Sequence, residues 1–239
     1  MKGQTPLLDV QSVQAGYGVS QVLFGIDLKI YPGQCVSLQG RNGMGKTTTI
    51  RTIMGELPCQ QGQIVYAGQR IDKLDTFRIA RLGIGLVPEG RQIFPNLTVW
   101  ENLIATARKP THGTTGWDQT RVLSLFPRLG ERMRNFGNQL SGGEQQMLAI
   151  GRALMTNPKL LILDEATEGL APVIREEIWK ALDVLRADGL SILITDKNLK
   201  QLLERCDHHY IVEKGVCVWH GGTADFVADP SLRQRYLAA

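Results

Sequence analysis

Residues 40–47 read Gly-Arg-Asn-Gly-Met-Gly-Lys-Thr. They match G-x-x-x-x-G-K-[ST], a pattern whose glycines let successive backbone N–H groups turn inward around a phosphate. Lys46 brings a positive charge to that phosphate, and the hydroxyl of Thr47 is a ligand for Mg²⁺. The sequence therefore predicts a phosphate-binding loop. Its residues are Gly40, Arg41, Asn42, Gly43, Met44, Gly45, Lys46, Thr47 and Thr48.

The flanking sequence predicts a strand before this loop and a helix after it. Residues 34–39 follow a Pro-Gly turn and are strand-like, whereas residues 48–54 read as a helix that Gly55 ends. The N-terminus of a helix carries a partial positive charge, so the order strand, loop, helix suits phosphate binding. The alternative is an ordinary glycine-rich turn with a solvated lysine.

The bulk properties are those of a globular protein. The chain has 239 residues, of which 43% are hydrophobic, and a net charge of +4. The basic excess is small and no dense Lys/Arg run occurs, so no nucleic-acid partner is expected. Residues 1–6 do not resemble a signal peptide, and no apolar run approaches the roughly 20 residues that span a bilayer. The four cysteines and four histidines lack metal-ligand spacing, which favours reduced thiols and structural histidines.

Two styles of strand are expected along the chain. The segments 7–13, 22–30 and 62–68 predict an antiparallel β edge, in which 22–30 alternates apolar and polar residues. The continuous apolar runs 160–163 and 190–195 are typical of strands buried on both faces.

A helix fills the interval between those two buried strands. It begins at Pro172, a favoured first helical residue, and Gly189 closes it. Strand–helix–strand at this length predicts a parallel crossover unit.

These elements predict an α/β fold, a P-loop NTPase core of RecA-like type with an antiparallel β edge and an inserted helical subdomain. Residues 1–94 and 159–239 are expected to form the nucleotide-binding core, and residues 95–158 the helical subdomain. The helical part contains a Pro/Thr/Gly turn cluster at 109–116.

Two carboxylates follow the buried strand 160–163, at the end where an open α/β sheet presents its site. Asp164 can hold Mg²⁺ directly or through water. Glu165 is then placed to orient and deprotonate an attacking water. The alternative is a solvated strand end followed by a turn.

Residues 141–144, Ser-Gly-Gly-Glu, fit the S-x-x-E capping box through Ser141 and Glu144. A capping box by itself does not require two glycines. Gly142 and Gly143 leave the helix N-terminus without neighbouring side chains, so a second anion can approach its N–H groups.

The phosphate loop, Ser-Gly-Gly-Glu-Gln-Gln at 141–146 and Leu-Asp-Glu at 163–165, in this order, resemble the ATP-binding-cassette ATPases. The likeness covers nearly the whole chain. It implies hydrolysis of Mg-ATP in a head-to-tail dimer with a second such ATPase subunit, where Ser141 serves the partner's nucleotide. Tyr17 matches the family's aromatic residue that stacks on adenine, the alternative being a core or edge-strand tyrosine.

Further segments resemble one branch of that family, the high-affinity branched-chain amino-acid importers. They are VPEGRQIFPNLTV at 87–99, FPRL at 126–129 and EGLAP at 168–172. Urea importers, which are close relatives, share much of this pattern. The branch carries Glu89 in its coupling loop where most cassettes have glutamine, and this carboxylate can still offer an oxygen to Mg²⁺ or water.

The resemblance also implies partners and a location. A peripheral subunit of this branch lies on the cytoplasmic face of the inner membrane and binds two membrane permease subunits. A periplasmic substrate-binding protein supplies the solute, so this chain does not itself select it. The branch usually pairs two different ATPases, which implies a heterodimer.

One departure concerns Lys197, which stands where most cassettes have a switch histidine. It can hold the γ-phosphate as a point charge, or it can be solvated, which leaves a non-hydrolysing regulatory cassette open. Two other classes fit less well. A soluble cassette acting on DNA or ribosomes usually has a coiled-coil insertion or a second cassette, and a small-molecule kinase needs an acceptor site.

Overall fold

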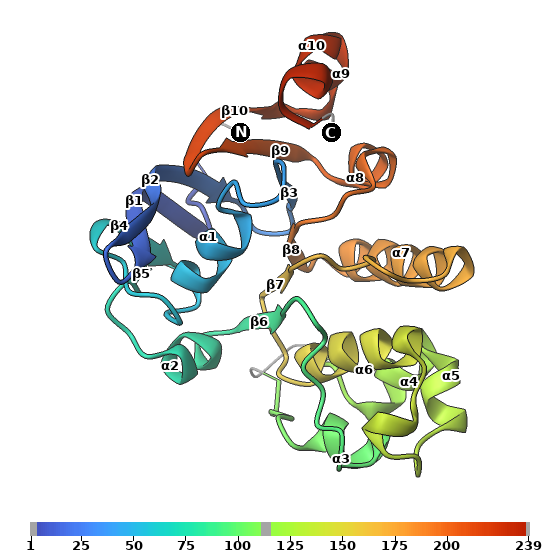
Figure 1. The fold of residues 1–239 in the computed structure, drawn as a ribbon. Coiled ribbons are helices and arrows are strands. Elements are labelled where there is room, and N and C mark those ends of the chain that lie inside the picture. Colours follow the sequence, from blue (N-terminus) through green and yellow to red (C-terminus); the bar gives the residue numbers. More distant parts are fainter. Residues whose placement is uncertain (1–3, 111–115, 238–239) are drawn as a thin grey trace. The chain divides into compact units, whose positions relative to one another are not determined.

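The structure, a computed structural model, describes residues 4–110 and 116–237. The chain forms two compact units, and Figure 1 labels their elements. Unit 1 comprises Met1–Leu82 together with Ser191–Ala239, and unit 2 comprises Gly83–Leu190.

Some sequence-based predictions remain open at this level. The subdomain boundaries expected after residues 94 and 158 stay a prediction. The turn cluster expected at 109–116 lies mostly outside the described residues, and so does the first half of the N-terminal segment 1–6.

Unit 1 contains an antiparallel sheet with the strand order β2-β1-β4-β5. Ile26, Leu28 and Ile30 of β2 are buried whereas Lys29 between them is exposed, so the predicted β edge is confirmed. The first strand extends well beyond the predicted residue 13, because a bulge at Ser12 (φ 48°) breaks the alternation there. The strands are β1 (Leu8–Tyr17), β2 (Ser20–Ile30), β4 (Gln61–Tyr66) and β5 (Gln69–Arg70).

The second sheet of unit 1 is centred on β3 (Cys35–Gln39), whose five residues are all buried. This strand pairs in parallel with β8 (Ser191–Ile194) on one side and with β9 (His208–Glu213) on the other. An antiparallel strand, β10 (Val216–Gly222), pairs with β9. The chain leaves the carboxyl end of β3 through the phosphate loop.

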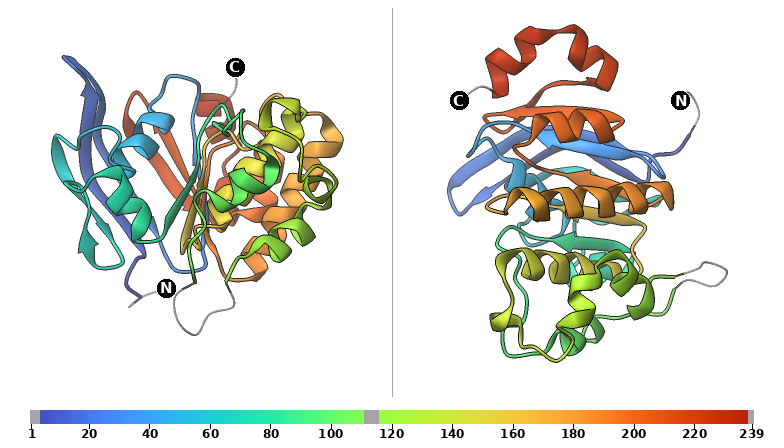
Figure 2. Two further views of the ribbon diagram at one scale, coloured as in Figure 1. Left: turned by 90° about the horizontal axis from the view of Figure 1, so that it is seen from below. Right: turned by 90° about the vertical axis from the view of Figure 1, so that its right-hand side faces the viewer.

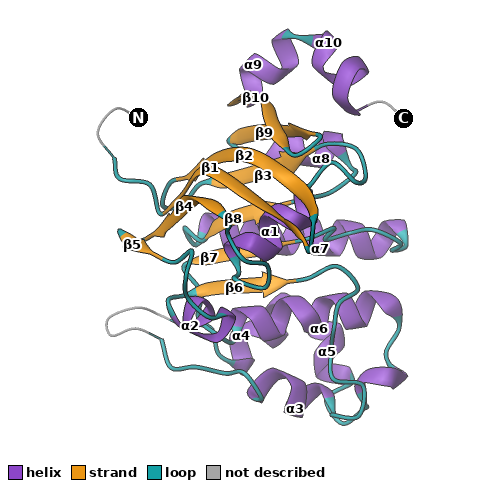
Figure 3. Ribbon diagram, turned by 60° about the vertical axis from the view of Figure 1, so that its left-hand side comes forward, coloured by secondary structure: helices purple, strands orange, loops and turns teal. Residues whose placement is uncertain are grey.

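Helix α1 (Lys46–Ile53) follows that loop and packs on β1 and β2, as Figure 3 shows. It begins two residues before the predicted start, because Gly45 in a left-handed conformation already serves as its N-cap. Gly55 (φ 70°) ends it as predicted.

Apart from α2, the remaining helices of unit 1 lie late in the chain. Phe226 and Leu232 pack on Ile211 of β9, so the red C-terminal helices in Figure 1 lie over β9 and β10. These elements are α2 (Thr76–Arg81), α8 (Leu199–Arg205), α9 (Thr223–Ala228), α10 (Pro230–Leu232) and a π-helical turn (Arg233–Leu237).

Unit 2 is mainly helical, as predicted for residues 95–158, and its helices appear in green to orange in Figure 2. A two-stranded parallel ladder joins β6 (Ile84–Val87) to β7 (Leu160–Leu163). Helix α6 contacts α3, α5 and β6, and its apolar face is buried. The helices are α3 (Val99–Ile104), α4 (Gln119–Leu125), α5 (Pro127–Glu131), a 3₁₀ turn (Gly137–Gln139), α6 (Gly142–Leu154) and α7 (Pro172–Ala187).

Helix α7 confirms the sequence pattern in detail. Pro172 is its first residue, and Gly189 (φ 80°) follows its C-cap. Ile178 and Leu185 are fully buried along one face. Because β7 belongs to unit 2 and β8 to unit 1, the predicted parallel crossover between these two strands stays a prediction.

Candidate functional site

The phosphate-loop residues 40–47 connect β3 to α1 within unit 1. Gly40 has φ 145°, and a Cβ added there would lie 2.3 Å from the backbone oxygen of Val212. A side chain at this position would therefore strain its own backbone and collide with β9. The N–H of Gly215 donates to the Met44 carbonyl at 3.0 Å, so the turn between β9 and β10 supports the loop.

The Lys46 side chain reaches back from the start of α1 to the beginning of the phosphate loop. Its Nζ atom donates to the carbonyl oxygens of Gly40 at 2.8 Å and Arg41 at 3.0 Å. The N-cap residue, Gly45, offers no side-chain acceptor to the first N–H groups of α1. An ammonium group beside the positive end of a helix with uncapped N–H groups is a suitable site for a phosphate.

Tyr17 lies at the end of β1 in the same unit, with 44% of its surface exposed. Arg51 of α1 donates from Nη1 to the Tyr17 hydroxyl at 3.4 Å. The ring is therefore available to a ligand near the helix that follows the phosphate loop. Stacking on adenine stays a prediction.

Lys197 follows β8, and its side chain is exposed. Strands β3 and β8 pair in parallel, with Ser37 opposite Ile194. Their carboxyl ends therefore lie at one edge of the sheet, and the phosphate loop and the Lys197 turn leave from that edge. Asn198 caps the helix that comes next, α8. This placement suits a lysine that reaches a phosphate, but the choice between that role and solvation stays open.

The predicted acids belong to unit 2. Strands β6 and β7 are paired up to Val87 and Leu163, and the Asp164 N–H donates to the Val87 carbonyl at 2.9 Å. Glu89 and the pair Asp164-Glu165 therefore leave the same edge of the ladder. Asp164 is only 2% exposed, so a carboxylate is held inside the protein at the strand end.

Glu165 has φ 53°, a left-handed conformation that is unfavourable for a glutamate. Such strain is often found at functional sites, which fits the predicted role of Glu165 as a base. Among the residues that the structure describes, no three His, Cys, Asp or Glu side chains converge on one point as a metal site. The predicted Mg²⁺ ligands Thr47, Asp164 and Glu89 are divided between the two units, and their common site stays a prediction.

Ser141 begins helix α6 with the predicted capping box, which is confirmed. The Ser141 Oγ accepts from the Glu144 N–H at 3.3 Å, and the Glu144 carboxylate accepts from the Ser141 N–H at 2.8 Å. Burial alone would raise the pKa of Glu144, but the Ser141 hydrogen bonds and the nearby Arg132 lower it below its ordinary value. Ser141 is thus fixed in orientation at the helix start.

The structure explains why residue 143 is a glycine, which the sequence alone did not. A Cβ at Gly143 would lie 2.6 Å from Cγ2 of Ile174, on helix α7. Close packing of α6 on α7 therefore requires glycine here, whether or not an anion approaches. No local signal predicts this contact, because the two residues are far apart in the sequence.

His209 is a residue that supports the site and that sequence analysis took as merely structural. Its Nδ1 is 2.7 Å from the Ser37 hydroxyl of β3, and its Nε2 is 2.9 Å from the Thr223 hydroxyl. Burial lowers the pKa of His209 to about 4, so the ring is neutral at pH 7. The strand that carries the phosphate loop is thereby tied to β9 and α9.

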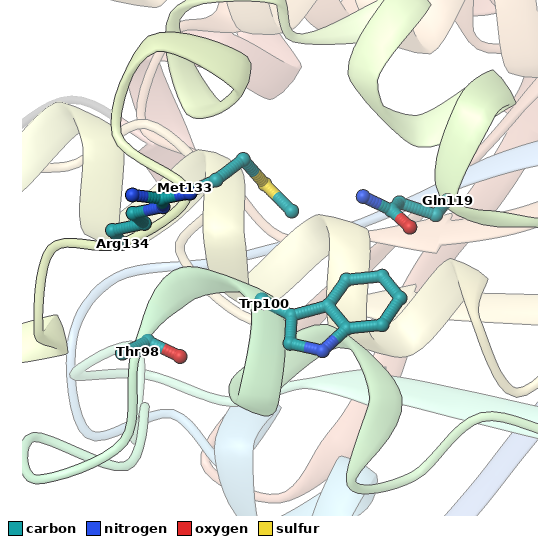
Figure 4. Close-up of a pocket in the computed structure, with 5 residues that line it drawn as sticks. All are labelled: Thr98, Trp100, Gln119, Met133 and Arg134. Atoms are coloured by element: carbon teal, nitrogen blue, oxygen red, sulfur yellow. The ribbon is translucent and has the colours of Figure 1, made fainter.

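A pocket of about 520 Å³ lies in unit 2, at the start of α3. The Trp100 ring and the Met133 thioether face the same space in Figure 4, with Gln119 and Arg134 on opposite sides. Trp100 is 41% exposed. The backbone N–H of Trp100 donates to the Met133 carbonyl at 3.2 Å, which holds the two sides of the pocket together. An aromatic and a thioether side chain suit an apolar protein segment.

A family model described as "ABC transporter" matches residues 23–168. The chain belongs to this family. It has the ABC ATPase cassette fold, with an antiparallel β subdomain and a helical subdomain, and it is an ATP-hydrolysing subunit of an ABC transporter. The predicted family, fold class and ATPase activity are confirmed.

Individual relatives resemble this ABC cassette over nearly its whole length. The "high-affinity branched-chain amino acid transport ATP-binding protein BraG" of Pseudomonas aeruginosa is 39% identical over 231 residues, which are 97% of this chain and 99% of BraG. The "lipopolysaccharide export system ATP-binding protein LptB" of Escherichia coli K12 is 33% identical over 96% of each chain. A solved dimeric bacterial ABC transporter cassette has a TM-score of 0.78 at 25% identity, covering 90% of this chain and 98% of that one.

A membrane-spanning helix was not expected in this ABC cassette. Every helix within residues 4–110 and 116–237 is too short or too polar to cross a bilayer.

Proposed function

We propose that this ABC ATPase powers a bacterial importer of branched-chain amino acids. The observation that carries the proposal is the 39% identity to BraG over 97% of the chain. The identity to LptB is lower, 33% over 96% of the chain. Urea import by the same branch of the family remains the alternative among importers.

The phosphate loop of unit 1 binds the triphosphate of ATP in this proposal. The backbone N–H groups at the start of α1 and the Lys46 ammonium hold the β- and γ-phosphates. Lys197, which leaves the same sheet edge, adds a second positive charge at the γ-phosphate. Replacing Lys197 with Ala is expected to slow hydrolysis by the assembled transporter. An unchanged rate would favour a solvated lysine, and a parent chain that binds but never hydrolyses ATP would indicate a regulatory subunit.

The acids of unit 2 supply the chemistry. Glu165 orients the attacking water and accepts its proton as the water oxygen attacks the γ-phosphorus. The Thr47 hydroxyl and the buried Asp164 carboxylate are hard oxygen donors of the kind Mg²⁺ prefers, and Glu89 adds a further oxygen. Bound Mg²⁺ would neutralise charge on the phosphates.

The cassette works as a head-to-tail dimer in this proposal, by analogy with the solved dimeric cassette. Residues 141–144 of one subunit face the ATP on the partner's phosphate loop. There the N-cap residue Ser141 and the N–H groups at the start of α6 contact the γ-phosphate. The partner is proposed to be a different ATPase, so that the dimer is a heterodimer.

The pocket beside α3 is proposed to receive a segment of a permease subunit. Trp100, which lines the pocket, is 41% exposed, so an aromatic surface is open to a partner there. Two permease subunits would hold the ATPase at the cytoplasmic face of the inner membrane, and a periplasmic receptor would deliver the solute to them. Trp100→Ala should reduce the amount of permease that co-purifies with the chain, whereas the exposed Val184→Ala on α7 should not.

The test of the transport proposal is purification of the chain from native membranes with identification of its partners. Two permeases of an importer are expected, and deletion of the gene should abolish high-affinity uptake of labelled leucine. Loss of urea uptake with intact leucine uptake would favour the urea branch. Recovery of lipopolysaccharide-export subunits instead would overturn the importer.

A further inference from the structure

The loop 88–95, which follows β6 and contains Glu89, has an unusual backbone. Three successive residues are left-handed, with φ of 79° at Gly90, 67° at Arg91 and 46° at Gln92. Non-glycine residues take this conformation at a cost, and it persists only where surrounding contacts hold it. Two arginine contacts with helix α6 help to hold it.

The first contact reaches the start of α6. Arg91 donates from Nη1 to the Gln145 Oε1 at 3.2 Å. The Gln145 Nε2 in turn donates to the carbonyl oxygens of Gly137 and Leu140, each at 3.2 Å. Leu140 directly precedes Ser141, so one side chain, Gln145, joins the loop to the segment that positions that serine.

The second contact fixes the other end of the loop. Arg152, in the last turn of α6, donates from Nη1 to the Gln92 carbonyl at 2.9 Å, and its guanidinium lies 4.3 Å from the centre of the Phe94 ring. Asn102 of α3 accepts from the Phe94 N–H at 2.9 Å. These contacts anchor this end of the segment to α6 and α3.

Gly142 is the residue that makes room for Arg91. A Cβ at Gly142 would lie 3.0 Å from both terminal nitrogens of the Arg91 guanidinium. A cation at the positive end of a helix is electrostatically unfavourable, so the guanidinium is not there to stabilise α6. Its hydrogen bond to Gln145 explains the position better.

We propose that Arg91 is a positioning residue, which transmits the position of the Glu89 loop to Ser141 through Gln145. A side chain at Gly142 would press on this guanidinium. The inference rests on the proposed function in one respect, that Ser141 serves the partner's ATP. It assigns Arg91 no contact with nucleotide.

The test compares the full chain in its transporter with the variants Arg91→Ala, Arg91→Lys, Gln145→Leu and the double variant Arg91→Ala/Gln145→Leu. Each of the four is expected to lower kcat about tenfold, with the KM for ATP changed less than about twofold. The double variant should be no slower than the slower single variant, because each single substitution already breaks the same Arg91–Gln145 hydrogen bond. Lysine keeps the charge but not the forked guanidinium. Arg128→Ala, which removes an exposed ion pair with Glu177, is the matched control and should keep the parent kcat.

Three results would overturn the proposed role of Arg91. They are a parent-like kcat in Arg91→Ala, full rescue by lysine, and losses that multiply in the double variant. Gly142→Ala displaces the guanidinium without removing it, and amide hydrogen exchange in the absence of nucleotide gives an independent check. The substitution should speed exchange at residues 141–145 in the parent but add little in Arg91→Ala; an equal increase in both backgrounds would contradict the proposal.

Amide hydrogen exchange separates this inference from the proposed function. Arg91→Ala should speed exchange of the amides of residues 141–145 and leave those of 46–53 in unit 1 unchanged. A parent chain without ATPase activity would overturn the proposed function. The exchange pattern would still show whether Arg91 positions residues 141–145. Unchanged exchange at 141–145 would reject it.

Discussion

Two helices of this protein begin in glycine-rich sequence, and they use glycine for different reasons. At α1 the glycines are needed for their conformation, since Gly40 and Gly45 have φ of 145° and 109°, and Gly40 also lacks room for a Cβ. At α6 space is the limit, because a Cβ at Gly143 would lie 2.6 Å from Ile174 and a Cβ at Gly142 would lie 3.0 Å from the Arg91 guanidinium. The α1 start has no side-chain cap, whereas Ser141 and Glu144 cap α6. The first start is built to surround a phosphate, and the second to hold one serine in a fixed position.

The largest effect is expected where neither helix start is altered. Glu165→Gln removes the proposed base but leaves both starts intact, so kcat should fall by about 100-fold or more while ATP affinity stays within about twofold. Rapid-mix hydrolysis and equilibrium binding of labelled ATP measure the two quantities. Near-parental hydrolysis would show that another group accepts the proton.

Gly40→Ala, compared with Gly43→Ala, separates backbone conformation from steric room at α1. The new Cβ would meet the Val212 carbonyl oxygen at 2.3 Å, so ATP affinity should fall about 100-fold, which corresponds to about 2.7 kcal/mol. Gly43→Ala is the matched control: its φ of 78° is also left-handed, but no atom lies within 4 Å of the new Cβ. Its smaller loss, about tenfold, would measure backbone strain alone. Equal losses would mean that the clash contributes nothing.

The sequence predicted the parts of both helix starts that depend on neighbouring residues. The strand–loop–helix order, the end of α1 at Gly55 and the capping box at Ser141 are local, and each was found. What it did not predict depends on residues far apart in the chain. Arg91 at Gly142, Ile174 at Gly143 and Val212 at Gly40 meet only in the folded protein.

Other features escaped prediction for related reasons. The bulge at Ser12 hid the continuation of β1 to Tyr17, because it broke the period-two pattern that identifies a strand. The contact of His209 with Ser37 joins strands that are distant in sequence. The common site of Thr47, Asp164 and Glu165 remains a prediction from the sequence motifs.

Gly143→Ala tests the role of space at α6. Overpacking against Ile174 should lower the free energy of unfolding by about 1–3 kcal/mol, measured by urea denaturation. Adding Ile174→Ala removes the colliding Cγ atoms and should relieve the overpacking part of this loss. Gly130→Ala on α5, where no atom lies within 4 Å, should be neutral or slightly stabilising. A loss in ATPase activity with unchanged stability would instead point to nucleotide access.

The two starts should also differ in their response to acid. His209, which supports the strand before the phosphate loop, has a pKa of about 4 in the folded chain because it is buried, below the ordinary 6.5. The unfolded chain therefore binds this proton first, and stability falls as the pH drops from about 6.5 towards 4. The Glu144 cap has a lowered pKa, so its contribution is lost only at lower pH, below its ordinary value of 4.5.

Urea titrations at pH 7.5 and 5.0 measure this difference. The free energy of unfolding should fall by about 1–2 kcal/mol on account of His209. His209→Gln should reduce this difference between the two pH values. If His209→Gln leaves the difference in unfolding free energy between the two pH values unchanged, other groups cause the acid sensitivity.

The most direct test is the crystal structure of the Glu165→Gln chain with ATP and Mg²⁺. The expected result is a head-to-tail dimer in which residues 40–47 of one subunit and Ser141 of the other contact the same triphosphate, with Asp164 at the metal. A nucleotide bound away from residues 40–47, or Ser141 turned away from every phosphate, would contradict the account.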